Sequence, residues 1–251
     1  MGQHSCSVQR LGDSTLISEV DFATNYKSHW RSLTPSMEQY VRRCNLDKYD
    51  RIYAPLPSLS GPERRGLINE TAFRLYTSIL RVGREKSLRD KAVISNSFRA
   101  AVSYIYGSHD ISVSDLDSVE RREVVVLAGR MEVFFLGRSN GTSIIASPLF
   151  KGSGIVDACH GDILIGGGSI WEIKAGDRQL RSIDFRQLTV YSALHYASTN
   201  VVPARIGVFN PRTGIALQTD MDTYCMAVSG LAPAELLYRL IALFSGHMVS
   251  A

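Results

Sequence analysis

The sequence is poor in cysteine, and its cysteines are not grouped. The 251 residues include 4 cysteines, at positions 6, 44, 159 and 225, and contain no CxxC pair. Scattered thiols of this kind are typical of reduced cysteines in the cytosol rather than of a disulfide framework. His160 follows Cys159, but no second pair stands at the spacing that a zinc site needs. We therefore expect neither disulfides nor zinc.

Long apolar runs are missing too. No run approaches the roughly 20 residues of a membrane helix, and residues 1–10 lack the apolar core of a secretory signal. We therefore expect a cytoplasmic protein that makes no membrane contact. The formal charge of +4 and the pI near 8.9 are compatible with a polyanionic partner. The length suits one domain with additions.

The periodicity of the apolar residues predicts an α/β protein whose first half is mainly helical. Residues 1–33 show no clear period, so we predict an irregular arm anchored by Phe22, Tyr26 and Trp30. Predicted helices cover residues 35–43, 60–82, 88–106, 114–134, 184–197 and 233–244. Predicted strands cover residues 143–146, 154–158, 162–165, 169–174, 205–209 and 215–218.

Two helix starts are predicted from capping patterns. Ser60 stands three residues before Glu63, and Ser114 stands three residues before Asp117. The first pair is the arrangement of a capping box, and Ser114 is predicted to cap the later helix. The β-branched run at 124–126 leaves a strand open as the alternative to the helix predicted there.

The stretch at 161–174 carries the clearest chemical pattern. An apolar run opens with Asp162, three glycines follow at 166–168, and a second run contains Glu172 and Lys174. Such runs predict the two strands of a hairpin joined by a tight glycine turn. Alternate side chains share a face, so Glu172 and Lys174 project together and Asp162 can lie beside them. Buried carboxylates need a partner or a cation, and oxygen ligands favour Mg²⁺ or Mn²⁺.

These residues resemble a known family. Asp162, followed ten positions later by Glu172-Ile173-Lys174, looks like the D…ExK signature of the PD-(D/E)xK nuclease superfamily. Gln187 and Tyr191 have the spacing of the QxxxY element in its RecB-type members, and residues 205–214 resemble their closing strand and turn. The resemblance covers about residues 143–220. Gly161 stands where the family emblem has proline, and no cysteine group closes the C-terminus, so we expect no iron–sulfur cluster.

The resemblance implies a restriction-endonuclease-like core: a central mixed β-sheet flanked by helices, with a mostly helical N-terminal extension. The corresponding domain prediction is an arm and short helix over residues 1–60. A single nuclease domain would then span residues 61–251, with a helical insertion at about 84–140.

The resemblance also implies roles for individual residues. Asp162, Glu172 and the backbone carbonyl of Ile173 would hold the metal ion, and Glu70, on a helix before the hairpin, would join them. A solvated helix glutamate is the other interpretation of Glu70. Lys174 would orient the attacking water. Two further residues, Gln187 and Tyr191, would brace the site or touch the phosphate backbone.

Some alternatives stay open at the level of single residues. Asp157 is a rival for the first acid, since it lies fifteen residues before Glu172. The basic run at 81–91 is either a solvated helix end or a set of phosphate contacts. Three arginines could clamp flanking phosphates, but scattered arginines are often only solubilising: Arg178, Arg181 and Arg186.

The function that the resemblance implies is a metal-dependent deoxyribonuclease, acting in phage defence or in DNA repair. Its partner would be DNA, and a homodimer or a partner protein in a multi-subunit complex stays open. The alternative is a non-catalytic nucleic-acid-binding or assembly subunit of a nuclease or motor complex, which the intact Asp162, Glu172 and Lys174 disfavour. A glycosidase using the two acids is disfavoured by the lysine beside them.

Overall fold

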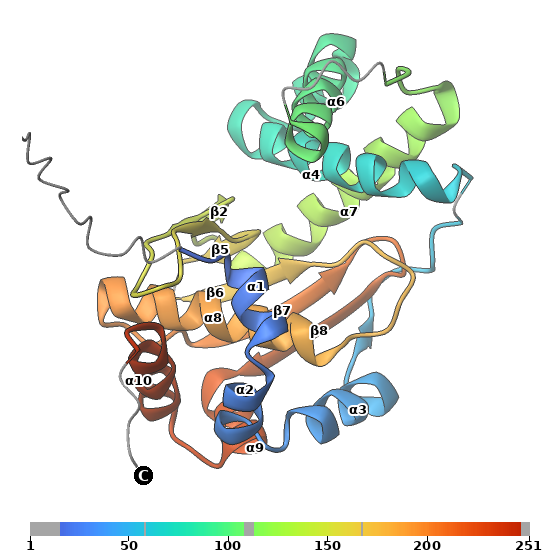
Figure 1. Cartoon of the computed structure of the whole chain (residues 1–251). Coiled ribbons are helices and arrows are strands. Elements are labelled where there is room, and N and C mark those ends of the chain that lie inside the picture. The colour runs from blue at the N-terminus through green and yellow to red at the C-terminus, as the bar shows by residue number, and fades with distance from the viewer. Residues whose placement is uncertain (1–15, 58, 108–112, 167, 247–251) are drawn as a thin grey trace, which may run out of the picture.

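A computed structural model describes residues 16–57, 59–107, 113–166 and 168–246, which are built around one mixed sheet (Figure 1). The six strands lie in the order β1-β8-β7-β6-β5-β2. Strands β6 and β7 are parallel and are joined by helix α8, whereas the other neighbouring pairs are antiparallel. The predicted α/β class, with a mixed sheet flanked by helices, is confirmed. The strands are β1 (Asp50–Arg51), β2 (Ile144–Ala146), β5 (Ile163–Ile165), β6 (Ser169–Ile173), β7 (Arg205–Asn210) and β8 (Ile215–Asp220).

Helices cover both faces of the sheet. On one face lie α8 (Ser182–Thr199), α9 (Met221–Ser229) and α10 (Pro233–Phe244), which pack on apolar residues that include Ile170 and Val208. On the other face α4 (Arg65–Val82) and α7 (Ser118–Ser139) pack on Trp171 and Phe209. Because side chains alternate along a strand, β6 presents Ile170 and Glu172 to the α8 layer and Trp171 to the α7 layer.

One glycine allows the two central strands to pack as they do. Trp171 is paired with Gly207 across the parallel β6–β7 ladder. A Cβ atom at position 207 would collide with the indole ring. The indole also contacts Phe134 and Phe135 edge-on, with ring centroids 5.3 and 5.8 Å apart. Gly207 therefore leaves the space in which the aromatic cluster under the sheet forms.

A helical unit stands above the sheet (Figure 1). It consists of α4, α5 (Arg84–Arg89), α6 (Lys91–Tyr106) and the first part of α7. The helix predicted over 88–106 is two helices, because Asp90 is extended (φ −80°, ψ 109°) and caps α6 by accepting a hydrogen bond from Ala92 N. The unit occupies the range predicted as a helical insertion and also includes α4.

The prediction of an irregular arm is wrong from residue 19 onward; residues 1–15 lie outside the described part. Helices α1 (Glu19–Asn25) and α2 (Lys27–Leu33) are present, and α3 (Met37–Asp47) follows, two residues later than predicted. Ser18 caps α1 by accepting a hydrogen bond from Asp21 N at 3.0 Å. The predicted anchors Phe22 and Trp30 are buried. Both helices are only seven residues long, too short to show a period.

Both predicted caps are wrong. Ser60 donates to Glu123 on α7 instead, and a 3₁₀ turn, η1 (Pro62–Arg64), precedes α4 without a side-chain cap. The cap of α7 is Asp117, whose carboxylate accepts from the backbone of Glu120, and Glu120 accepts from Asp117 N in return. Residues 124–126 are helical, so the strand alternative is excluded.

Residues 154–158 do not form the predicted strand. Val156 makes only isolated bridges, to Ile17 and Ser153. The neighbouring segments pair as a separate two-stranded sheet, β3 (Leu149–Phe150) and β4 (Cys159–His160). The three cysteines in the described part, Cys44, Cys159 and Cys225, are free and buried; Cys6 lies outside it.

No single helix in the described ranges has the length and apolar character to cross a membrane. Helices α9 and α10 pass that test only as a pair bent by 64°. One face of each helix, which includes Tyr224, Val228 and Leu237, is fully buried against the sheet and α8, whereas Met226 and Tyr238 are exposed.

Candidate active site

The register of the β5–β6 hairpin brings two carboxylates together. Ile163 is paired with Trp171, so Asp162 and Glu172 are the next opposed positions of the antiparallel pair. Oδ2 of Asp162 accepts a hydrogen bond of 2.6 Å from the backbone N–H of Ile173. This bond holds the Asp162 side chain over β6. The predicted meeting of Asp162 with Glu172 is therefore present.

Lys174 completes the group from the end of β6. Its Nζ lies 2.6 Å from Oε1 of Glu172, and the Glu172 side chain is only 5% exposed. The second oxygen of Glu172, Oε2, is buried and has no hydrogen-bond partner. The backbone N–H of Lys174 donates to Phe209 O on β7, which fixes the chain direction at this point.

Helix α8 lays Gln187 and Tyr191 over the hairpin. Oε1 of Gln187 accepts from Lys174 Nζ at 3.1 Å, and its Nε2 donates to the hydroxyl of Tyr191 at 2.7 Å. The two residues lie one helical turn apart and so share a face of α8. The predicted QxxxY pair therefore contacts the predicted lysine through a continuous chain of hydrogen bonds.

The start of α8 is stabilised by an acid that the sequence interpretation did not single out. Asp184 accepts a hydrogen bond from Arg181 N, and each of its two carboxylate oxygens accepts one from the Arg178 guanidinium. It also lies 3.8 Å from Lys174 Nζ. Arg178 is therefore engaged in an ion pair rather than free to clamp a phosphate. Arg186, 3.5 Å from Glu38, lies over Trp30 and also has partners of its own.

The electrostatics of the site follow from burial and from the opposed acids. Burial raises the pKa of Asp162 well above its usual range, and the charge of Glu172 adds to this. Burial also raises the pKa of Glu172, although Lys174 opposes the shift. Burial alone would lower the pKa of Lys174, but Glu172 outweighs it and the net shift is upward. The lysine is therefore held as an ammonium beside the acids.

Two further acids approach this group. Glu70 on α4 forms an ion pair with Arg74 at 2.7 Å, and its charge contributes to raising the pKa of Asp162. Glu19 on α1 accepts a 3.4 Å hydrogen bond from the Tyr191 hydroxyl. Glu19 was missed because its segment was predicted to be irregular; the Ser18–Asp21 capping pattern was the signal that could have identified its helix.

The rival first acid lies apart from the site. Asp157 is exposed, and its carboxylate accepts a hydrogen bond from the adjacent Ala158 N. Its position in a turn before β4, rather than on β5, explains why it does not face Glu172.

The oxygen donors of the site are suited to a hard divalent cation that is bound by only a few protein ligands. Among the described residues, no group of three or more His, Cys, Asp or Glu side chains converges as a metal site. Asp162 and Glu172 do converge, and the unpartnered Oε2 of Glu172 is a buried acceptor that a cation would satisfy. Mg²⁺ is commonly bound by one or two carboxylates together with water. The residues present therefore fit such an ion.

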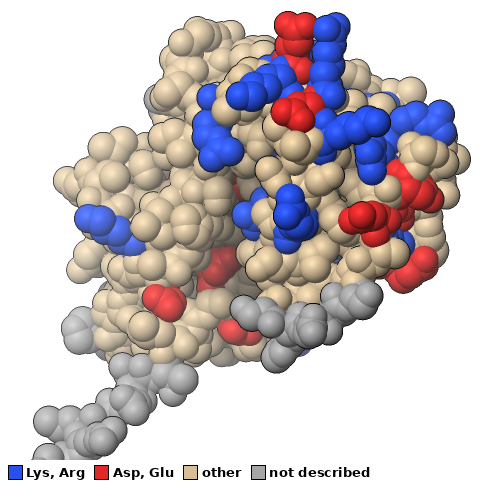
Figure 2. Space-filling view, turned by 90° about the horizontal axis from the view of Figure 1, so that it is seen from above, with Lys and Arg blue, Asp and Glu red and all other residues tan. Residues whose placement is uncertain are grey.

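Figure 2 shows the molecule from the side of the helical unit. Lysine and arginine side chains gather on that unit, and acidic side chains are visible in the depression between the unit and the rest of the molecule. Comparison of the chain with protein-family models, curated proteins and solved structures gave no match. No relative's activity therefore bears on this site.

Proposed function

We propose that the protein is a metal-dependent deoxyribonuclease that hydrolyses phosphodiester bonds at the Asp162–Glu172–Lys174 group. The observation that carries the proposal is the pair of opposed carboxylates, one with an unpartnered buried oxygen, beside an ammonium. A cluster of this kind is costly to bury unless it binds a cation or substrate.

The order of elements supports the same proposal. A hairpin with the first acid immediately before β5 and the ExK residues on and just after β6 is followed by α8 and then by the parallel strand β7. This is the order that the resemblance to RecB-type members of the PD-(D/E)xK superfamily implies. The restriction-endonuclease-like core, and a role in phage defence or DNA repair, belong to this proposal.

The metal ion would be held by Asp162, Glu172 and the backbone carbonyl of Ile173, with Glu70 able to join from α4. Mg²⁺ or Mn²⁺ bound there supplies polarisation of a phosphoryl oxygen and lowers the pKa of a bound water. The chain's own contribution is to hold two acceptors together on a rigid hairpin, where the Ile173 N–H fixes Asp162.

Lys174 places a positive charge where a phosphate would approach. Its ammonium stabilises negative charge that develops on the phosphate and can orient the attacking water. Gln187 accepts a further hydrogen bond from the ammonium, and Tyr191 in turn accepts one from Gln187. The lysine therefore has a fixed position rather than the freedom of an ordinary surface lysine.

The test is a cleavage assay with purified protein on linear, circular and single-stranded DNA in Mg²⁺, Mn²⁺ or EDTA. We expect cleavage that needs the metal and that falls by at least about 100-fold in Glu172→Gln and in Lys174→Met. Asp157→Asn and Lys151→Met are matched controls, since both residues are exposed and lie outside the group. Cleavage that survives EDTA, or that is unchanged in Glu172→Gln, would remove the proposal.

A second candidate is a non-catalytic subunit that binds nucleic acid. It is favoured by the 2.6 Å contact in which Lys174 already neutralises one oxygen of Glu172. In that case the same assay would show DNA binding without cleavage under any metal condition.

A further inference from the structure

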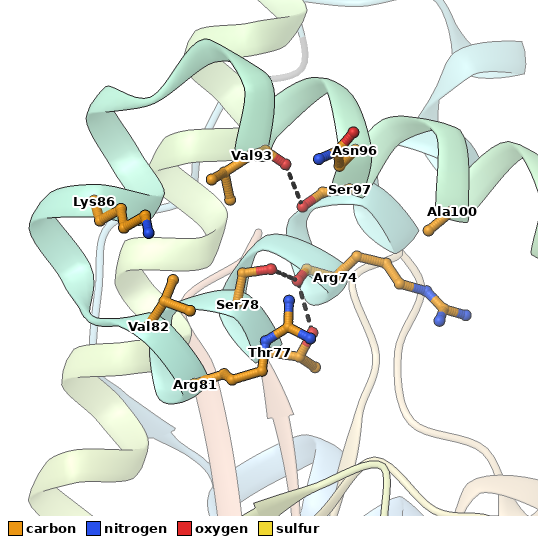
Figure 3. A pocket seen from close by; sticks show the side chains of 10 residues that line it. All are labelled: Arg74, Thr77, Ser78, Arg81, Val82, Lys86, Val93, Asn96, Ser97 and Ala100. Carbon is orange, nitrogen blue, oxygen red and sulfur yellow. Dashed lines mark hydrogen bonds between the residues drawn. The ribbon is translucent and has the colours of Figure 1, made fainter.

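The helical unit contains a hollow that the active-site description does not use. It lies between α4, α5 and α6 and has a volume of about 540 Å³. Figure 3 shows its lining, in which α4 contributes Arg74, Ser78 and Arg81, α5 contributes Lys86 and α6 contributes Asn96 and Ser97. The volume is in the range of ligand pockets and can accommodate a nucleotide unit.

The lining is positively charged and polar. Three of its side chains are cations, Arg74, Arg81 and Lys86, and none is acidic. Two neighbours outside the lining, Arg84 and Arg89, are paired with Glu132 and Glu85. In the described part of the chain, by contrast, neither Arg81 nor Lys86 makes an ion pair or a side-chain hydrogen bond. Arg74 is paired with Glu70, so Arg81 and Lys86 are the two uncompensated cations of the hollow. Uncompensated positive charge of this kind is the electrostatic signature of a phosphate-binding surface.

The hollow leads toward the candidate active site. On α4 the spacing of Glu70, Arg74, Ser78 and Arg81 places these residues on one helical face, and Glu70 is bonded to Arg74 at 2.7 Å. At a rise of about 1.5 Å per residue, Arg74 and Arg81 are about 10 Å apart along the helix. That separation exceeds the spacing of single phosphates along a strand, so Arg81 can contact a phosphate that lies away from the Glu70–Arg74 pair.

The end of the hollow nearest the acids carries an exposed aromatic ring. Tyr104 is one turn beyond Ala100 on α6 and is 70% exposed. The Arg74 guanidinium lies over its ring, 4.9 Å from the centroid. Partial burial raises the pKa of Tyr104, and the charges of Glu70 and Asp162 add to the shift, which places the phenol in the field of the active-site acids. An exposed ring beside a cation is the arrangement with which proteins stack single-stranded bases.

We propose that this hollow binds the sugar–phosphate backbone of one nucleic-acid strand next to the scissile phosphate, with Tyr104 as the platform for a base. Arg81 and Lys86 contact phosphates away from the cut, and Arg74, which is paired with Glu70 and lies over the Tyr104 ring, holds that ring in place. The inference rests on the proposed nuclease function for the position of the cut, but the binding itself does not require cleavage. It assigns the basic run at 81–91 a part in binding through two of its cations.

The test is fluorescence anisotropy of a labelled single-stranded oligonucleotide in EDTA, with the full chain at several salt concentrations. The plot of log K against log salt has a negative slope, and each lost phosphate contact reduces the magnitude of that slope by about 0.7 for a single strand. The double variant Arg81→Ala/Lys86→Ala should therefore lose about 1.4 from the slope and bind about 25-fold more weakly at 0.1 M salt. The difference should shrink to about threefold at 0.5 M.

Separate variants test the ring and the location of the charge. Tyr104→Ala should weaken binding at least about fivefold with little change in the salt slope, whereas Tyr104→Phe should retain most of the affinity. Arg239→Ala removes one exposed cation from α10, on another part of the molecule, and should leave affinity and slope nearly unchanged. Circular dichroism of each variant verifies that it is folded.

The outcomes separate this inference from the proposed function. Unchanged affinity and slope in a folded double variant would overturn the inference, even if metal-dependent cleavage is present. Loss of affinity in the double variant would support it, even if no cleavage is found. A double variant that loses affinity only for inorganic phosphate or ATP, and not for the oligonucleotide, would show a nucleotide site and overturn it. A larger loss on duplex than on single-stranded DNA would also contradict it.

Discussion

Asp162 immediately precedes β5 and, in continuation of the antiparallel register, lies opposite Glu172 on β6, so that the two carboxylates approach each other on one side of the sheet. Directly opposed like charges destabilise a strand pair. The protein keeps them together through the Ile173 N–H, which binds Asp162, and through the ammonium of Lys174, which binds Glu172. The predictions below follow from this balance and from the packing that supports it.

Removing one of the two charges should stabilise the metal-free protein. Asp162→Asn keeps an acceptor for Ile173 N but removes the repulsion, so we expect Tm in EDTA to rise by about 2–4 °C, which corresponds to about 1 kcal/mol for a chain of this size. Cleavage should be lost in the same variant. Asp157→Asn is the control and should leave Tm unchanged within about 1 °C. A lower Tm for Asp162→Asn in EDTA would contradict the assigned repulsion.

The same pair should make stability depend on pH. A carboxyl with a raised pKa in the folded state holds its proton more tightly there than in the unfolded chain. Stability in EDTA should therefore decrease as the pH rises from the ordinary carboxyl range, about 4, through the raised folded values. Thermal melts at steps of pH should show this decline in the wild type and a smaller one in Asp162→Asn. Equal declines in both would show that the pair is not the cause.

Gln187 should act as a positioning residue rather than through contact with the reacting atoms. Gln187→Met preserves length but removes the link between Lys174 and Tyr191, so we expect kcat to fall by about 10–100-fold with KM little changed. Tyr191→Phe removes only the outer bond and should have a smaller effect. Steady-state cleavage kinetics distinguish the two roles: a KM increase without loss of kcat would indicate substrate binding instead.

The Arg212 side chain should stabilise the packing of the helical unit against the sheet. It is buried and is bonded to Glu123 on α7, to Asn69 on α4 and to the Ala175 carbonyl after β6. Arg212→Met would leave the Glu123 carboxylate buried without its ion-pair partner, though still bonded by the Ser60 hydroxyl, at a cost of about 3–5 kcal/mol in the free energy of unfolding. Urea unfolding measures the change. The double variant Arg212→Met/Glu123→Met should recover part of it, and no recovery would mean that the pair is not coupled.

The contact between Trp171 and Gly207 should limit which side chains the central strands tolerate at position 207. Gly207→Ala adds a methyl group where the indole lies and should cost about 1–3 kcal/mol through overpacking. Gly137→Ala, on α7 with open space around it, should instead stabilise by roughly 0.5–1 kcal/mol. Paired urea unfolding curves test both signs, and a neutral Gly207→Ala would show that the indole can move aside.

The local pattern of the sequence determined the hairpin. Its period of two, broken by glycines, was sufficient to predict that Asp162, Glu172 and Lys174 meet, because strand alternation and a short turn fix these positions without distant contacts. The spacing of Gln187 and Tyr191 placed both on one helical face for the same reason. The α/β class followed from such local periods as well.

Only the tertiary structure decided which distant residues join the hairpin. Glu19 reaches it from α1, more than 150 residues before Glu172 in the sequence, and no local pattern encodes that approach. Glu70 on α4 was predicted there only through the family resemblance. Ser60 does not cap the helix as predicted, because its hydroxyl donates a hydrogen bond to Glu123 on α7. The helix α1, too short to show a period, is held by burial of Phe22. Local propensity set the strands and helices, whereas long-range burial and charge pairing selected their neighbours.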